Sequence, residues 1–302
     1  VLVMKTAFAD YSYSVFAWDI RKIMKQRGAS VEQAAELLKD AGVTGFDASC
    51  KDPQIPDLVA CGLKAVNLFG DVPCRDGSGG GEVGEAFLAT AVRYGAKCVM
   101  VFPEDFAADE DKEHAFAAMA VGLEAFARKT AAAGVQTTIE DFGAGLKNPC
   151  SYGLYLKRFL KECPHVALAL DSGNLYYAGR GDDILDVMDA AGDRIGHVHL
   201  KDQAHGDPRS FVTLGTGAVP NREILRRLAA RSYKGWITIE NPVGNDLLAD
   251  VRRQIAFVQS VARVAGTEFG AGDCQMPKNA FVVQNCRGYN SRPMIQAMGD
   301  GE

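Results

Sequence analysis

Residues 195–202, IGHVHLKD, alternate between apolar and polar positions. Because the side chains of a β-strand point alternately to its two faces, this pattern predicts a strand with a polar and an apolar face. His197, His199 and Lys201 share the polar face. Three ionisable groups pack poorly in an apolar core, but they suit the lining of a polar ligand site.

Three other stretches show the same alternation, at residues 135–142, 166–171 and 236–240. In each predicted strand one face is apolar, and the strand ends in a side chain able to bind a metal ion. With the strand at residues 195–202, the candidate metal ligands are Glu140, Asp171, His199 and Glu240.

Strand and helix patterns alternate along most of the chain. The predicted strands cover residues 4–8, 42–49, 63–70, 97–103, 135–142, 166–171, 195–202 and 236–240. The predicted helices cover residues 31–42, 56–61, 82–94, 109–133, 154–161, 183–190, 222–230 and 246–264. Ser30 is expected to cap the first helix. Tyr11 and Tyr13 are expected in a loop that follows the first strand. Two further loops are expected at residues 71–81 and 204–220.

Such alternation implies parallel strands joined by right-handed crossovers, and eight units closing on themselves form a (β/α)8 barrel. A doubly wound open sheet is the alternative, but in an open sheet the ends of the last four strands would not converge round one point as readily as in a closed barrel. In a barrel, functional groups lie at the carboxyl ends of the strands, where the four candidate ligands fall. The predicted fold is therefore an α/β TIM barrel over residues 1–265.

Residues 266–302 lack a helical period and are rich in turn-forming residues. They predict an irregular C-terminal extension outside the barrel, which would cover the barrel mouth, contact a partner subunit or remain disordered.

Composition narrows the class of protein. The 302 residues are 47% hydrophobic and carry a net charge of −5, which gives no reason to expect nucleic acid or an anionic membrane as partner. No apolar run approaches the roughly 18 residues of a membrane helix, and the N-terminus lacks a signal-peptide pattern. The eight cysteines form no CxxC pair and are interpreted as buried thiols of a reducing cytoplasm.

Two glutamates, an aspartate and a histidine make a mostly oxygen ligand set, which suits Mn²⁺, Mg²⁺, Co²⁺ or Zn²⁺. Such an ion would polarise a sugar carbonyl and stabilise the enediolate left when a neighbouring C–H loses its proton. Glu140 and Glu240 are the candidate acid/base pair. His197 is expected to pack behind His199, whereas Lys201 is expected either to hold a substrate oxygen or to pair with a carboxylate.

The motifs TIEDFG (138–143), LDSGNLYYAG (170–179), HVHLKD (197–202), LGTGAVP (214–220) and GWITIEN (235–241) resemble the sugar phosphate isomerase/epimerase family of the xylose isomerase-like TIM-barrel superfamily. The resemblance runs over residues 3–264. It implies a divalent ion, often Mn²⁺, bound by Glu140, Asp171, His199 and Glu240, with both glutamates moving protons. It also implies a homo-oligomer.

The chain departs from the family's epimerases at two substrate positions. Asn174 stands where many members have a histidine three residues after the strand-six aspartate, and an amide cannot carry a proton at neutral pH. His205, with Arg209 nearby, stands where the epimerases have an arginine. Asn174, Lys201, His205 and Arg209 are therefore the candidate substrate-binding residues of a changed pocket.

The leading hypothesis is a cytoplasmic, metal-dependent isomerase or epimerase of a sugar or keto-sugar. A lyase or dehydratase acting on a keto-sugar, an inosose or a 3-keto-glycoside is the second hypothesis, and a non-catalytic metal- or sugar-binding barrel subunit is the third. The related DNA-repair endonuclease uses many more histidine ligands than this chain, with five histidines, supplies.

Overall fold

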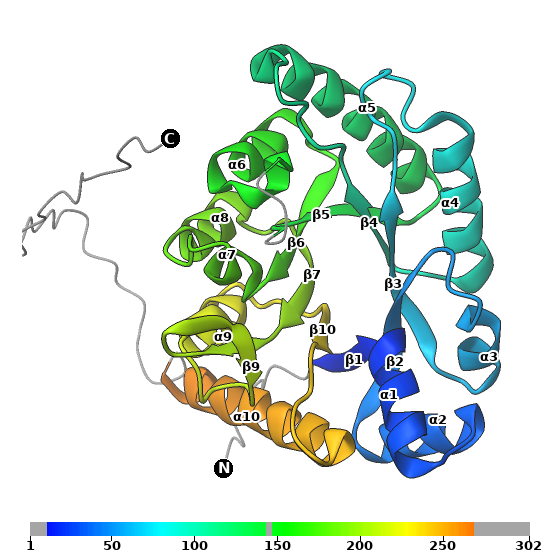
Figure 1. Ribbon diagram of the computed structural model, residues 1–302, viewed down its shortest axis with the longest axis vertical. Helices are drawn as coiled ribbons and strands as arrows, with labels where there is room; N and C mark the ends of the chain where they lie inside the picture. Colours follow the sequence, from blue (N-terminus) through cyan, green and yellow to red (C-terminus); the bar gives the residue numbers. More distant parts are fainter. Residues whose placement is uncertain (1–10, 143–146, 269–302) are drawn as a thin grey trace, which may run out of the picture. The chain divides into compact units, whose positions relative to one another are not determined.

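The computed structural model describes residues 11–142 and 147–268, and the predicted C-terminal extension lies almost entirely outside them. Eight parallel strands form a closed barrel in the order β1-β10-β7-β6-β5-β4-β3-β2 (Figure 1). They are β1 (Ser12–Phe16), β2 (Val43–Ser49), β3 (Lys64–Asp71), β4 (Cys98–Phe102), β5 (Gln136–Glu140), β6 (Val166–Asp171), β7 (Ile195–Leu200) and β10 (Trp236–Ile239). The predicted (β/α)8 barrel is confirmed.

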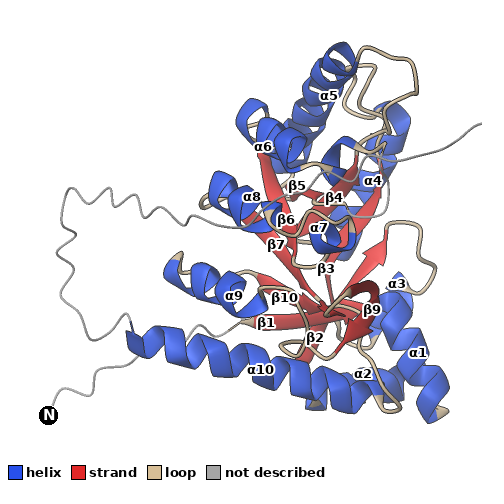
Figure 2. Ribbon diagram, turned by 60° about the vertical axis from the view of Figure 1, so that its left-hand side comes forward, coloured by secondary structure: helices blue, strands red, loops and turns tan. Residues whose placement is uncertain are grey.

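Helices surround the strands (Figure 2). They are α1 (Ala17–Arg27), α2 (Val31–Asp40), α3 (Ile55–Ala60), α4 (Gly81–Tyr94), α5 (Lys112–Ala132), α6 (Gly153–Glu162), α7 (Asn174–Tyr177), α8 (Asp183–Ala191), α9 (Asn221–Ala230) and α10 (Leu247–Glu268), with a 3-10 turn at Pro149–Ser151. None of these helices is both long and apolar enough to span a bilayer.

The main apolar core lies between the strands and the helices. Val198, Leu200, Ile237 and Ile239 are fully buried in it, as the alternation of β7 and β10 predicts. The opposite faces of these strands, which carry His197, His199 and Thr238, point into the barrel interior, where the three side chains share hydrogen-bond partners. The polar and apolar faces therefore lie where the sequence predicts.

The first strand of the barrel lies later in the chain than predicted. The first barrel strand is β1, which pairs with both β2 and β10 and so completes the ring. Tyr13 is part of this strand and does not lie in a loop, and residues 4–8 lie outside the described part of the chain. The short run SYSVF gives a weak strand signal because it joins directly to α1, a helix that the sequence patterns do not predict either.

The predicted loop at residues 204–220 contains more structure than expected. Strand β8 (Asp202–Ala204) pairs antiparallel with β9 (Asp207–Val212) to form a small hairpin. By contrast, the helix start at Ser30 is confirmed, because its hydroxyl accepts from the backbone N–H of Gln33 while the Gln33 side chain accepts from the Ser30 N–H.

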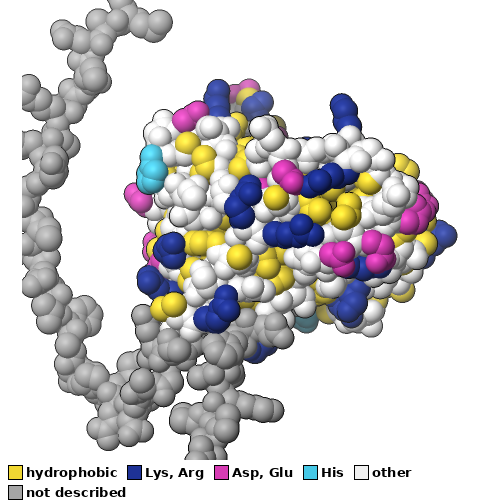
Figure 3. Space-filling model, turned by 90° about the horizontal axis from the view of Figure 1, so that it is seen from below, with side chains coloured by type: hydrophobic (Ala, Val, Ile, Leu, Met, Phe, Trp, Pro, Cys, Tyr) yellow, Lys and Arg dark blue, Asp and Glu magenta, His cyan; other side chains and the backbone are white. Residues whose placement is uncertain are grey.

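On the face shown in Figure 3, basic side chains lie among acidic and apolar ones. Such a mixture agrees with the modest net charge of the chain.

Candidate metal centre

The carboxyl ends of four neighbouring strands bring the predicted ligands together. Glu140 ends β5, Asp171 ends β6, and Glu240 directly follows β10. The parallel register sets Asp171 beside His199 of β7. Strand closure therefore gathers side chains that are up to 100 positions apart in the sequence.

Three carboxylates face the same nitrogen of the His199 ring. The Nδ1 atom lies 2.6 Å from Glu140 Oε1, 3.9 Å from Asp171 Oδ2 and 4.0 Å from Glu240 Oε2. Ligand atoms of Glu140, Asp171 and His199 all lie within 4.8 Å of one another, a spacing that one ion can bridge. Glu240 is not part of this group of three, although its Oε2 approaches the same nitrogen, and its role as a fourth ligand remains a prediction.

Lys201 is the cation in this acidic cluster. Its Nζ lies 2.8 Å from Asp171 Oδ2 and 2.8 Å from Glu240 Oε1. Two roles were open for Lys201, and these contacts are those of the second, pairing with carboxylates. Burial alone would lower the pKa of Lys201, but the charges of Asp171 and Glu240 outweigh burial and hold the pKa above its ordinary value. The ammonium is therefore a permanent positive charge.

The cluster retains an excess of negative charge. Glu140, Asp171 and Glu240 are three carboxylates, and Lys201 and His199 together can supply at most two compensating charges. Burial raises the pKa of Asp171 to about 6, while Lys201 opposes that rise. Buried carboxylates without full compensation are costly, and a divalent cation would remove the excess. The donor set and its charge therefore fit a hard divalent ion.

Asp141 supports Asp171 from behind. Its Oδ1 accepts the backbone N–H of Asp171 at 2.7 Å, and its Oδ2 is buried without a partner. Burial, with the neighbouring charge of Asp171, raises the pKa of Asp141 well above its ordinary value. Through this hydrogen bond Asp141 fixes the backbone at the end of β6.

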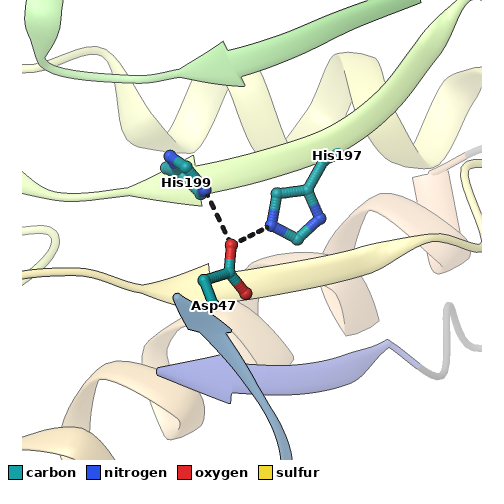
Figure 4. Close-up of side chains that lie close together, drawn as sticks. All are labelled: Asp47, His197 and His199. Carbon is teal, nitrogen blue, oxygen red and sulfur yellow. Dashed lines mark hydrogen bonds and ion pairs between the residues drawn. The ribbon is translucent and has the colours of Figure 1, made fainter. Parts of the chain in front are cut away.

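A second polar layer lies deeper in the barrel, around Asp47 of β2. Asp47 Oδ2 lies 2.7 Å from His197 Nε2 and 3.0 Å from His199 Nε2 (Figure 4). His197 thus lies behind His199, as expected from the sequence. The role of Asp47 was missed, although the alternation of β2 already places it opposite Phe46 and Ala48, which face the helices.

A cavity of about 170 Å³ opens against the cluster. Its polar lining comes from Glu140, Asn174, Lys201 and Glu240. Its apolar lining comes from Met100 and from a series of aromatic rings, in which Trp18 stacks on Phe16 with centroids 4.0 Å apart and Phe69 packs edge-on against both. Phe102 and Phe142 continue the series. The cavity therefore has one charged wall and one aromatic wall.

The predicted substrate residues separate into two groups. Asn174 and Lys201 line the cavity, and the backbone N–H of Asn174 donates to Asp171 Oδ1 at 2.9 Å. His205 and Arg209 are exposed in or beside the β8–β9 hairpin, and neither is among the cavity-lining residues. Their contact with a substrate remains a prediction.

Comparison with known proteins agrees with this architecture. The family model described as xylose isomerase-like TIM barrel matches residues 85–261, which include all four candidate ligands. The chain therefore belongs to the xylose isomerase-like TIM barrel family.

Individual relatives are distant. A putative hydroxypyruvate isomerase of Streptomyces coelicolor is 32% identical over 95 residues, covering 31% of this chain and 28% of the relative. An inosose dehydratase of Histophilus somni is 28% identical over 166 residues, covering 49% and 55%. The chain thus matches about half or less of the length of these curated relatives.

Among solved structures, an L-ribulose 3-epimerase superposes with a TM-score of 0.65 at 16% sequence identity. The match covers 88% of this chain and 100% of that one. At this level of identity the likeness establishes the fold alone.

Proposed function

We propose that the protein is a divalent-metal-dependent isomerase or epimerase of a sugar or keto-sugar, acting by proton abstraction next to a carbonyl. The observation that carries the proposal is the convergence of Glu140, Asp171, His199 and Glu240 on one side of a small cavity. A bound ion, with Mn²⁺ as the first candidate, would supply the positive charge that polarises the carbonyl oxygen.

Glu140 and Glu240 would move the protons. Both line the cavity, and each is held by one cationic or polar neighbour: Glu140 by His199, and Glu240 by Lys201 at 2.8 Å. Epimerisation requires one group to remove a proton from carbon and a second group to return a proton from the other face. Two carboxylates entering the cavity from different strands meet that requirement.

The cavity indicates an uncharged substrate of monosaccharide size. Lys201 is the sole cationic side chain among the described residues that line it, and it is already paired with Asp171 and Glu240. A phosphate group here would face carboxylates without a free cation. The aromatic wall would instead cover the C–H face of the substrate, because rings such as Trp18 and Phe69 bury apolar surface.

A lyase or dehydratase is the second candidate, because Asn174 lines the cavity where the family's epimerases are expected to have a histidine, so the pocket differs from theirs. Elimination uses the same abstraction, after which a neighbouring acid protonates the leaving oxygen. The amide of Asn174 cannot donate a proton for that purpose, so one of the two glutamates would have to serve. The named activity of the Histophilus somni relative is of this kind.

The test uses Glu240→Gln, which keeps the size of the side chain and removes its ability to take a proton. We expect turnover to fall about 10²- to 10⁴-fold, the usual contribution of a general base. The measurement is ¹H/²H exchange from D₂O into a panel of keto-sugars, inososes and 3-keto-glycosides, read by mass spectrometry. A product that keeps all the substrate's heavy atoms and gains only deuterium identifies isomerisation, whereas a product that has lost water, or the glycosidic alcohol in the case of a 3-keto-glycoside, identifies elimination.

The matched control is Glu162→Gln, on the outer helix α6, where the carboxylate pairs with Arg158. This variant should keep full activity. Full activity of Glu240→Gln would refute the acid/base assignment. A wild-type protein that binds Mn²⁺ but exchanges no proton with any substrate in the panel would favour the non-catalytic binding barrel.

A further inference from the structure

Asp47 is a carboxylate enclosed in the barrel interior, and its partners come from several strands. Its Oδ2 accepts from His197, His199 and the Asn67 amide, which lies 3.2 Å away. Its Oδ1 accepts the Thr238 hydroxyl at 3.1 Å, and Thr238 in turn contacts Ser14 at 2.8 Å. Both carboxylate oxygens are therefore occupied by donors.

The His199 ring lies between two carboxylates, with Nε2 3.0 Å from Asp47 Oδ2 and Nδ1 2.6 Å from Glu140 Oε1. An ionised carboxylate can only accept hydrogen bonds, so His199 must present Nε2–H to Asp47. A neutral imidazole has one N–H and one lone pair. An ion bound among Glu140, Asp171 and Glu240 would replace the proton on Nδ1, and the remaining N–H would then be the one that Nε2 donates to Asp47.

We propose that Asp47 is a positioning residue of the metal centre, which locks His199 in the Nε2–H tautomer and directs the Nδ1 lone pair at the ion. The inference rests on the metal centre of the proposed function. Metal-binding histidines commonly donate their second nitrogen to a carboxylate or carbonyl, and this outer partner strengthens and orients the ligand.

The cost of the arrangement argues against a purely structural role. Bulky apolar side chains usually fill the interior layers of such barrels. A buried carboxylate whose partners are two imidazoles, an amide and a hydroxyl lacks a permanent cation beside it. Apolar residues of similar volume would usually be at least as stable there. His197, Asn67 and Thr238 then hold Asp47 in position for His199.

The decisive variant is Asp47→Asn, studied in the full-length chain. The amide keeps the volume of the side chain, but its NH₂ group cannot accept from an imidazole N–H. We expect Mn²⁺ affinity to fall about 10- to 100-fold, the usual loss when such an outer partner is removed. Affinity is measured by calorimetric titration with Mn²⁺ and by the electron paramagnetic resonance signal of the free ion.

The matched control is Thr137→Val, which removes a buried hydrogen bond between Thr137 of β5 and Thr130 of α5 and leaves every hydrogen-bond partner of Asp47 and His199 unchanged. It should destabilise the fold about as much as Asp47→Asn in thermal unfolding, yet keep Mn²⁺ affinity within about twofold of the wild type. If both variants lose affinity in step with their stability, the role of Asp47 is structural and the proposal is refuted.

A second measurement does not depend on any variant. In the Zn²⁺-loaded wild-type protein, ¹⁵N chemical shifts of the histidine rings should show His199 protonated at Nε2 and metal-bound at Nδ1. Binding through Nε2 would refute the role of Asp47 while leaving the metal centre intact. A wild-type protein that binds neither Mn²⁺ nor Zn²⁺ would refute the metal centre itself, and the proposal with it.

Discussion

At the scale of single residues, Gly122 shows how close packing fixes an identity that sequence patterns do not explain. It lies in the middle of α5, where glycine is usually unfavourable by about 1 kcal/mol relative to alanine. A Cβ atom at this position would lie 1.9 Å from the carbonyl oxygen of Cys74. The helix therefore needs glycine where the loop at residues 71–81 crosses it.

Gly122→Ala should destabilise the protein by about 1–3 kcal/mol, because the overlap with backbone atoms outweighs the gain in helix propensity. Chemical denaturation with urea measures the change in the free energy of unfolding. The neighbouring variant Val121→Ala, at a position that is 62% exposed, should change that free energy by less than about 0.5 kcal/mol. Equal stability of Gly122→Ala and the wild type would contradict the close contact.

At the scale of elements, Asp202 organises the segment after β7. Its Oδ2 accepts the backbone N–H groups of Gly215 and Gly217 at 2.9 and 3.0 Å. Its Oδ1 accepts those of Val219 and Gln203. The HVHLKD and LGTGAVP motifs thus form one structural unit. In the loop beside the candidate metal centre, the buried carboxylate of Asp202 accepts backbone N–H groups that have no partner in a helix or strand.

Asp202→Asn should cost about 2–4 kcal/mol of stability, because the NH₂ group replaces an acceptor of two N–H groups and leaves buried donors unpaired. Hydrogen exchange of the amides at Gly215 and Gly217, followed by NMR, should accelerate in the variant. Asp207→Asn, which changes an aspartate of the exposed β8–β9 hairpin, is the control and should leave these rates unchanged. Unchanged protection in Asp202→Asn would contradict the role given to this carboxylate.

At the scale of the whole barrel, an ion in the proposed metal centre would link strand ends that are otherwise joined only through their neighbours in the sheet. A ligand that binds the folded chain alone stabilises it by about 2.7 kcal/mol at a hundred times its dissociation constant. Mn²⁺ should therefore raise the thermal unfolding temperature by several degrees, and EDTA should reverse the rise.

The same addition to Glu140→Gln or His199→Ala should produce a much smaller rise, because each variant lacks one ligand of the cluster. Differential scanning calorimetry at matched protein and metal concentrations provides the comparison. An equal rise in the wild type and in both variants would place the ion elsewhere and contradict the centre.

Much of this organisation could be predicted from the sequence because its signals are local. The alternation of β7 placed His197 and His199 on one face, and Ser30 with Gln33 marked the start of α2. The first strand could not be predicted in the same way. Its identity depends on hydrogen bonds to β2 and β10, which are remote in sequence, and residues 4–8, MKTAF, give an equally strong local signal.

The sequence by itself determined the barrel class and the side chains at four strand ends, because the periodicity and the order of the strands can be recognised from consecutive residues. Only the tertiary structure decided that Lys201 forms ion pairs with both Asp171 and Glu240, and that aromatic rings line the side of the cavity opposite these charges. It also decided that Asp47, deeper in the barrel, contacts the His199 ring. These relations depend on distances across the closed ring. Distances of that kind arise only when strands far apart in the chain complete their hydrogen bonds.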